Sequence, residues 1–182
     1  MLVAEGWDAR VGALVLASCE TFDNYPPGLP GRTAAQAARI PGGLLAALWP
    51  MRFKALRRLP MTFGLMSKRP VPDELFASWL DPVLTDARVR RDLVKYAGDT
   101  KAGRRALEAA DSSLGDFSKP VLVAWAAEDR VMPIDSGHRL AASFPNSRWV
   151  EIPASRTLIP IDQPQALATV IASFVTDSIG EG

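Results

Sequence analysis

The sequence predicts an α/β protein with about three parallel strands and helices flanking them. Three short segments carry this prediction: residues 11–18 (VGALVLAS), 121–125 (VLVAW) and 148–152 (RWVEI). The first two are nearly continuous apolar runs, which is typical of strands in a parallel sheet with both faces covered. The third alternates between apolar and polar residues, which predicts a more exposed strand near the sheet edge.

Residues 1–10 are interpreted as the end of a helix, because their apolar side chains share one face and no capping residue precedes them. After the first strand comes the loop 19–31. Its Pro26-Pro27-Gly28 sequence can continue neither a strand nor a helix.

The long segment 31–117 is predicted to be helical and irregular, since prolines interrupt it often and no strand-like alternation occurs. Within it, Val89, Leu93 and Tyr96 are spaced as the inner face of an amphipathic helix over residues 86–96. The basic residues of that helix are predicted to face solvent, and they are Arg88, Arg90, Arg91 and Lys95.

After residue 129 the pattern is helix, strand, turn and helix. A helix is predicted over residues 134–143, because its apolar residues lie on one side. Pro145 and Asn146 end it. The final helix begins near Pro164. Its apolar stripe has helical spacing and consists of Leu167, Val170, Ile171, Phe174 and Val175.

Composition and charge favour one soluble globular domain, or a core with a helical insertion. The chain has 182 residues, of which 48% are hydrophobic and 23% charged, and its net charge is +1. Such a balance creates no broad field for nucleic acid or an anionic membrane. The basic runs at 52–58 and 87–95 are interpreted as solvated helix faces. We therefore expect a small-molecule partner, with no nucleic acid and no membrane.

A single cysteine, Cys19, excludes an intramolecular disulfide framework and favours the cytoplasm. The N-terminus lacks a basic region, and no apolar run approaches the roughly 18 residues of a spanning helix. One histidine and one cysteine cannot build a zinc site, and no glycine-rich phosphate loop occurs. We expect neither a metal nor a cofactor.

Asp129 is the first candidate functional residue, because it follows the second predicted strand directly. Ligands of open parallel sheets bind outside the carboxyl ends of the strands, where this side chain would lie. The alternative is a turn aspartate that bonds the backbone two residues further on and has no other role.

The stretch 119–133, KPVLVAWAAEDRVMP, resembles the C-terminal part of the α/β-hydrolase family, in which a strand of the type PVLVxxGxxD precedes a proline-containing turn. Residues 10–16, RVGALVL, match the pattern that follows the nucleophile helix in that family. Ala127 stands where many members have glycine. The resemblance makes Asp129 the acid of a Ser-His-Asp set, which orients the imidazole and stabilises its protonated form.

The same resemblance implies the domain organisation. Residues 1–30 and 118–182 would form a partial α/β-hydrolase core, and residues 31–117 would form a helical cap inserted into it. The catalytic serine would lie on a G-x-S-x-G turn roughly one helix before Met1, so it is not in this chain.

In the family, the general base lies in the loop between the last strand and the last helix, which here is residues 153–164 (PASRTLIPIDQP). The closing residues Asp162-Gln163-Pro164 align the base with Arg156 or Thr157. We then expect Asp129 to lie near enough to one of them for a hydrogen bond, directly or through one water. Neither can act as a base near pH 7, because arginine stays protonated and the threonine hydroxyl is a poor base. His138, inside a predicted helix, is interpreted as a surface or packing residue.

The resemblance therefore implies the C-terminal part of a hydrolase acting on an ester or similar small apolar substrate, inactive as this chain alone. A non-catalytic small-molecule-binding or interaction protein with the same fold is the alternative. Glu20 and Asp23 are second choices for the acid, because some members of the fold place a carboxylate after the first strand. The residues that we expect to contact substrate are Phe22, Trp49, Phe53 and Trp79; ordinary helix packing is the alternative for such side chains.

A further expectation concerns the strand at 11–18. In the family, the corresponding strand lies between the nucleophile strand and the strand corresponding to 121–125, so one of its edges would lack a partner here. An apolar, unpaired edge favours self-association, and neither charge nor proline interrupts this one.

Overall fold

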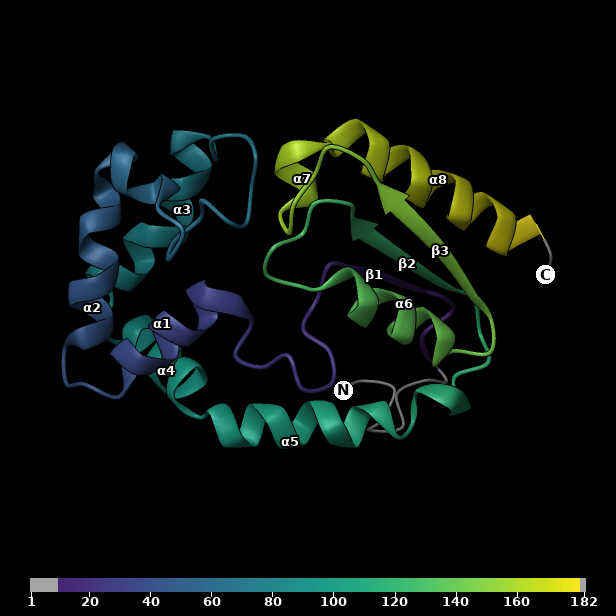
Figure 1. Cartoon of the computed structure of the whole chain (residues 1–182), viewed down its shortest axis with the longest axis horizontal. Helices are drawn as coiled ribbons and strands as arrows, with labels where there is room; N and C mark the ends of the chain where they lie inside the picture. The colour runs from purple at the N-terminus through teal and green to yellow at the C-terminus, as the bar shows by residue number, and fades with distance from the viewer. Residues whose placement is uncertain (1–9, 181–182) are drawn as a thin grey trace.

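The sheet has three parallel strands, as the computed structural model of residues 10–180 shows (Figure 1). β1 (Leu14–Ala17), β2 (Val121–Ala126) and β3 (Ser147–Ile152) lie side by side in that order. The predicted α/β class is therefore confirmed. The helix end predicted over residues 1–10 lies outside the described residues, apart from Arg10.

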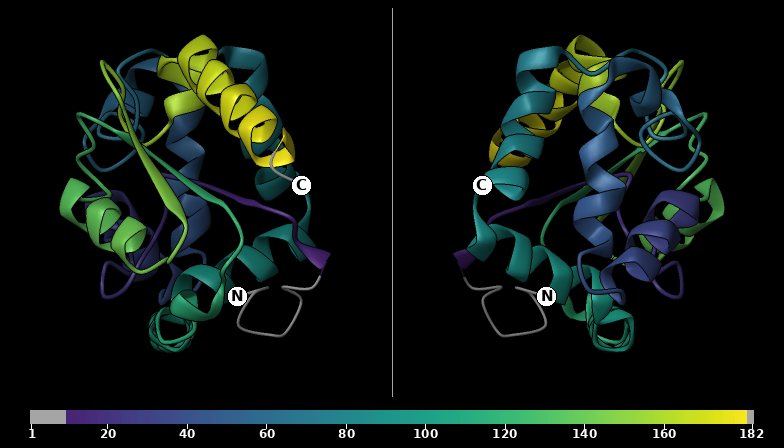
Figure 2. Two further views of the ribbon diagram at one scale, coloured as in Figure 1. Left: turned by 90° about the vertical axis from the view of Figure 1, so that its right-hand side faces the viewer. Right: turned by 90° about the vertical axis from the view of Figure 1, so that its left-hand side faces the viewer.

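β2 is the centre of the sheet, and every one of its residues is buried. Val123 and its alternate neighbours belong to the core beneath α6 (Ile134–Ala142), whereas Leu122 and its alternate neighbours belong to the core beneath α8 (Pro164–Gly180). Figure 2 shows these two helices on opposite sides of the sheet. Since successive strand residues point to opposite faces, a continuous apolar run is what a strand between two helical layers requires.

Between β1 and β2 the regular elements are all helices, and residues 28–116 are called the helical segment below. Figure 1 shows its first four α-helices gathered beyond the carboxyl ends of β2 and β3, while α5 runs back toward the sheet. This placement puts the helical segment over the edge at which parallel sheets bind ligands. The elements are α1 (Gly28–Ala38), α2 (Gly43–Leu48), η2 (Trp49–Arg52), η3 (Lys54–Arg58), α3 (Asp73–Thr85), α4 (Ala87–Gly98), α5 (Thr100–Asp111) and η4 (Leu114–Asp116).

The helix predicted over 86–96 is α4, but its inner face differs from the prediction. Val89 and Tyr96 are exposed, and Arg90, expected to face solvent, is half-buried. The Arg90 guanidinium donates hydrogen bonds to the carbonyls of Val83 (2.8 Å) and Leu84 (3.2 Å), in the last turn of α3. Terminal helix carbonyls lack partners within their own helix, so this capping draws the arginine inward.

β1 pairs with β2 along one edge, and within the described residues its other edge has no partner strand. Leu14 and Leu16 pack against the core beneath α6. Val15 points to the other face and is 38% exposed, because the core beneath α8 includes no residue of β1. This edge strand is therefore apolar and partly open.

Candidate active site

Asp129 lies in the loop directly after β2, at the carboxyl end of the sheet. Its Oδ1 accepts hydrogen bonds from the amides of Val131 (2.9 Å) and Met132 (2.8 Å), and from the Thr157 hydroxyl (2.7 Å). The amide bonds close the turn that a loop aspartate commonly makes. The hydroxyl bond joins Asp129 to the loop after β3, and it makes Thr157, not Arg156, the residue beside Asp129.

The loop after β3 is shaped by a second carboxylate, Asp162, which is 1% exposed and belongs to α7 (Ile159–Asp162). It accepts hydrogen bonds from the amides of Lys68, Arg69 and Arg156 at 2.9 to 3.0 Å, and from the Ser67 hydroxyl at 2.8 Å. Asp162 therefore holds the loop that carries Thr157 against the helical segment.

Burial of Asp162 opposes its ionisation. The hydrogen bonds from three amides and one hydroxyl stabilise the charged form more, and together they hold the pKa of Asp162 below the usual 3.8. A carboxylate with this many donors is ionised at neutral pH, so its charge is available to organise the loop.

Three further contacts tie the helical segment to the loops at the carboxyl end of the sheet. The Leu158 amide donates to the Met66 carbonyl at 2.8 Å. The Arg156 guanidinium donates to the Gly64 carbonyl at 2.6 Å. Lys68 adds an ion pair with Glu128, the residue before Asp129. The segment 64–69 is thereby fastened over the two loops that carry Asp129 and Thr157.

Thr157 cannot replace the imidazole of a Ser-His-Asp set. Its hydroxyl already donates to Asp129, and a threonine hydroxyl does not take up a proton near pH 7. The other predicted base position, Arg156, directs its guanidinium to the Gly64 carbonyl instead of to Asp129. Among the described residues, Asp129 Oδ2 is a buried oxygen that accepts no hydrogen bond.

An apolar cavity of about 290 Å³ lies inside the helical segment. Methionines and leucines of α2, η2 and the chain after η3 line much of it, and Met66 connects it to the Asp129 site, because the Met66 carbonyl binds the residue that follows Thr157. Its lining includes Leu44, Leu48, Met51, Met61, Phe63 and Met66. Such a lining suits an apolar molecule.

The four residues expected to contact substrate do not come together. Phe22 is buried in the core beneath α6, with the Arg139 guanidinium 3.7 Å from its ring centroid. Trp49 and Phe53 are half-exposed and pack edge-to-face against each other. Trp79 stacks on Phe63, with 6.0 Å between the ring centroids. None of these four lines the apolar cavity.

The second-choice acids lie in the loop after β1. Glu20 is half-buried and lines a small pocket of about 150 Å³ together with Phe22, whereas Asp23 is exposed. Cys19 lines the same pocket, and burial, followed by the charge of Glu20, raises the pKa of its thiol to about 11. A thiol of this kind stays protonated at neutral pH and is a poor nucleophile.

His138 is exposed on α6, and its ring lies 4.2 Å from the Trp149 ring centroid. His138 is therefore a surface residue that packs against β3. Within residues 10–180, no three His, Cys, Asp or Glu side chains are grouped as a metal ion would require. No helix in that range is long and apolar enough to cross a bilayer.

Sequence reasoning recognised Asp162 only as part of the closing motif of the loop, and it missed Ser67 altogether. The two are 95 positions apart in the chain, and their side chains meet only because the helical segment folds over the loop after β3. The proline spacing around Asp162 marked the loop, but no local pattern indicated its partners.

Residues 8–164 match the family model described as alpha/beta hydrolase fold, and the chain belongs to this family. It is 36% identical over 62 residues to the uncharacterized hydrolase YugF of Bacillus subtilis (strain 168), a match that covers 34% of this chain and 23% of that protein. It is 29% identical over 140 residues to the 2-hydroxy-6-oxononadienedioate/2-hydroxy-6-oxononatrienedioate hydrolase of Cupriavidus pinatubonensis (strain JMP 134 / LMG 1197), covering 76% of this chain and 45% of that protein.

A solved structure with a similar fold is the 2-hydroxy-6-oxo-6-phenylhexa-2,4-dienoate hydrolase (BphD) from Rhodococcus sp. strain RHA1. The TM-score is 0.70 at 18% identity, and the likeness covers 96% of this chain and 58% of that one. At such identity the likeness shows the fold alone. The chain spans less than two thirds of the length of each of these three proteins.

Proposed function

We propose that this chain carries three parts of an α/β-hydrolase-fold protein for an ester or similar small apolar substrate. They are the loop after β2 that holds Asp129 (the acid loop), the loop after β3 that holds Thr157 (the base loop) and the helical cap. We also propose that the chain does not hydrolyse the substrate by itself. The observation that carries the proposal is the 2.7 Å hydrogen bond from the Thr157 hydroxyl to Asp129. It joins the acid to the base loop at a side chain that cannot act as a base.

The absence of a base explains why we expect no hydrolysis. In a Ser-His-Asp set the imidazole removes the proton of the nucleophile and later protonates the leaving group, and the acid only orients and stabilises it. Residues that act as a unit lose nearly all their effect when one is missing. Asp129 could orient an imidazole, but it cannot carry out the proton transfer for which the imidazole is needed.

The proposed cap is residues 31–117, inserted between core segments 1–30 and 118–182. Two observations support it. Helices α1 to α4, which fall largely within this stretch, lie beyond the carboxyl ends of β2 and β3 (Figure 1), and the stretch contains most of the lining of the apolar cavity. A cavity of about 290 Å³ is close to the lower end of the range for small-molecule sites, which favours a compact substrate.

A first prediction is that the 182-residue chain hydrolyses p-nitrophenyl acetate and butyrate no faster than an equal concentration of the Asp129→Asn variant. Removing the acid should change nothing, because the proton-transfer step already lacks its base. Initial rates of p-nitrophenolate release measure this directly.

A fluorophosphonate probe, which labels activated serines, gives a second test of the same prediction. We expect no covalent adduct by intact-mass spectrometry. A burst of p-nitrophenolate, or a stoichiometric adduct on any serine of the chain, would contradict the proposal and indicate an unrecognised nucleophile.

A non-catalytic ligand-binding protein is the second candidate, and the identity of residue 157 favours it. The base loop is part of this chain, so residue 157 is a threonine even if the protein has further residues outside this sequence. Translating the DNA upstream of Met1 discriminates between the candidates. An in-frame G-x-S-x-G turn together with another histidine that reaches the site favours a catalytic protein, and a turn without Ser, Cys or Asp at its centre favours a binding protein.

A second prediction tests the geometry of the site through Thr157→His. An imidazole at this position should donate to Asp129, and the adjacent carboxylate should raise its pKa above the ordinary value of about 6.5. Titration of the introduced imidazole signals by NMR gives this pKa.

The control for this titration is the double variant Thr157→His with Asp129→Asn. It removes the negative charge while keeping a side chain of similar shape, so the pKa of the introduced imidazole should fall back toward its ordinary value. An imidazole that titrates identically with and without the Asp129 charge would show that residue 157 is not a base position facing the acid.

A further inference from the structure

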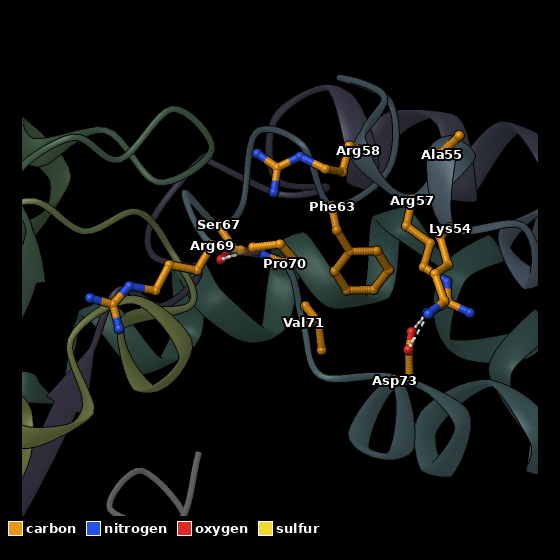
Figure 3. A pocket seen from close by; sticks show the side chains of 10 residues that line it. All are labelled: Lys54, Ala55, Arg57, Arg58, Phe63, Ser67, Arg69, Pro70, Val71 and Asp73. Carbon is orange, nitrogen blue, oxygen red and sulfur yellow. Dashed lines mark hydrogen bonds and ion pairs between the residues drawn. The ribbon is translucent and has the colours of Figure 1, made fainter.

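A second cavity, of about 360 Å³, lies between η3 and the chain that leads into α3 (Figure 3). It is separate from the apolar cavity, although Phe63 lines both. Neither Asp129 nor Thr157 lines it. Its chemistry is therefore distinct from that of the acid and base loops.

Basic side chains outnumber acidic ones around this cavity. Lys54, Arg57 and Arg58 line it together with one carboxylate, Asp73. Both Lys54 and Arg57 pair with Asp73, the latter at 2.9 Å between Nη1 and Oδ1. Figure 3 shows these three side chains meeting at one side of the cavity. One negative charge is thus shared by two cations, and two further cations, Arg58 and Arg69, also line the cavity.

Arg58 is the first of these two further cations. Its guanidinium donates one hydrogen bond to the Lys68 carbonyl at 3.2 Å, and it forms no ion pair with any residue between 10 and 180. A guanidinium has five N–H donors, so most of its capacity is unused by these residues. Arg69 also lines the cavity, but in Figure 3 its side chain extends away from the Phe63 ring.

The centre of the cavity is apolar and rigid. The Phe63 ring lies at its centre, with Pro70 and Val71 on one side and Ala55 on the other (Figure 3). Phe63 is held by Phe76, at 5.2 Å between ring centroids, and by the stacked Trp79. An aromatic ring fixed by two others offers a preformed flat surface at little entropic cost.

We infer that this cavity binds a small organic carboxylate with a compact apolar body, the carboxylate bound by Arg58 and the body packed on Phe63. A guanidinium recognises a carboxylate through paired hydrogen bonds, whereas the ring surface recognises apolar groups. The volume suits a molecule of the size of phenylacetate. This inference goes beyond the proposed function, because it assigns a ligand class to a site that the acid and base loops do not line.

The test is isothermal titration calorimetry of the full chain with phenylacetate at low ionic strength. We expect saturable binding with a Kd of about 1 mM or below. Arg58→Gln should weaken binding about tenfold, because it removes charged hydrogen bonds to the carboxylate. The matched control is Arg105→Gln, which makes the same change on exposed α5 outside the cavity and should leave the Kd unchanged.

A second variant, Ala55→Trp, fills the cavity from an exposed position and should abolish binding with little effect on the core. The neutral phenylacetamide and inorganic phosphate should both bind at least about tenfold more weakly than phenylacetate. Phenylacetamide lacks the negative charge, and phosphate lacks the apolar body.

Three results would overturn the inference: no saturable binding of phenylacetate, equal binding of either comparison compound, or equal effects of the two arginine variants. Because no ester is hydrolysed in this experiment, its failure leaves the proposed function untouched. A failure of the hydrolysis prediction would likewise leave the cavity assignment standing.

Discussion

Replacing Asp162 with alanine should lower the free energy of unfolding by about 4 kcal/mol, because it leaves several buried donors without an acceptor. The amides of Lys68, Arg69 and Arg156 and the hydroxyl of Ser67 all converge on this carboxylate, which is 1% exposed. Urea unfolding followed by circular dichroism measures the effect. The loss should be accompanied by release of the segment 64–69 from the loop after β3.

Two variants make this result interpretable. Asp162→Asn keeps one acceptor oxygen and should cost less than Asp162→Ala. The asparagine variant can still be measured if the alanine variant fails to fold. Asp177→Ala is the matched control and should cost about 0.5 kcal/mol or less, because among residues 10–180 Asp177 accepts bonds only from exposed Arg148 and Ser173. Equal losses for Asp162→Ala and Asp177→Ala would contradict a role for Asp162 in fastening the loop.

The pH dependence of this contribution has a defined direction. Because the pKa of Asp162 is lower in the folded protein than the usual 3.8, its stabilising effect is fully present above 3.8 and is lost as the pH falls through the lowered folded value. The difference in unfolding free energy between the natural protein and Asp162→Asn should therefore shrink in that acid range.

The open edge of β1 should make the chain self-associate. At micromolar concentrations we expect size-exclusion chromatography with light scattering to report a mass above that of one chain, and Val15→Lys to restore the single-chain mass. The reason is that, as far as residues 10–180 go, this edge has no partner strand and offers backbone N–H and C=O groups next to a valine that is 38% exposed. A lysine there opposes pairing.

Val89→Lys is the matched control for this experiment. Val89 is 39% exposed on α4, so the substitution adds the same charge at similar exposure but away from the sheet. It should leave the association unchanged. A natural protein that remains a single chain across micromolar concentrations would show that the β1 edge does not drive association.

The strands were predictable because their signal is local. β2 lies on the predicted 121–125 run with one residue added, and β3 on the predicted 148–152 run with one residue added at its start. Burial on both faces demands apolar residues at every position of a central strand, and that demand is visible in the sequence without knowing what covers the strand. β1 is shorter than the apolar run at 11–18, since only four of its residues pair with β2.

The inner face of α4 was not predictable in the same way. The spacing of Val89 and Tyr96 indicated one face, but Arg90 turns inward to cap the carbonyls at the end of α3. Whether a long basic side chain faces solvent depends on which acceptors a neighbouring helix leaves open, and these belong to another part of the chain.

By itself the sequence determined the α/β class and the position of Asp129 after a central strand, because each depends on residues close together in the chain. The choice of Arg156 or Thr157 as the neighbour of Asp129 came from the resemblance of the loop after the last strand to that of the α/β-hydrolase family. Only the tertiary structure decided that Thr157 is the one that meets Asp129, at 2.7 Å, and that Asp162 draws Ser67, Lys68 and Arg69 onto the same loop. Hydrogen bonds act over about 3 Å, whereas these partners lie many residues apart, so their pairing is set by how the helical segment folds back over the sheet.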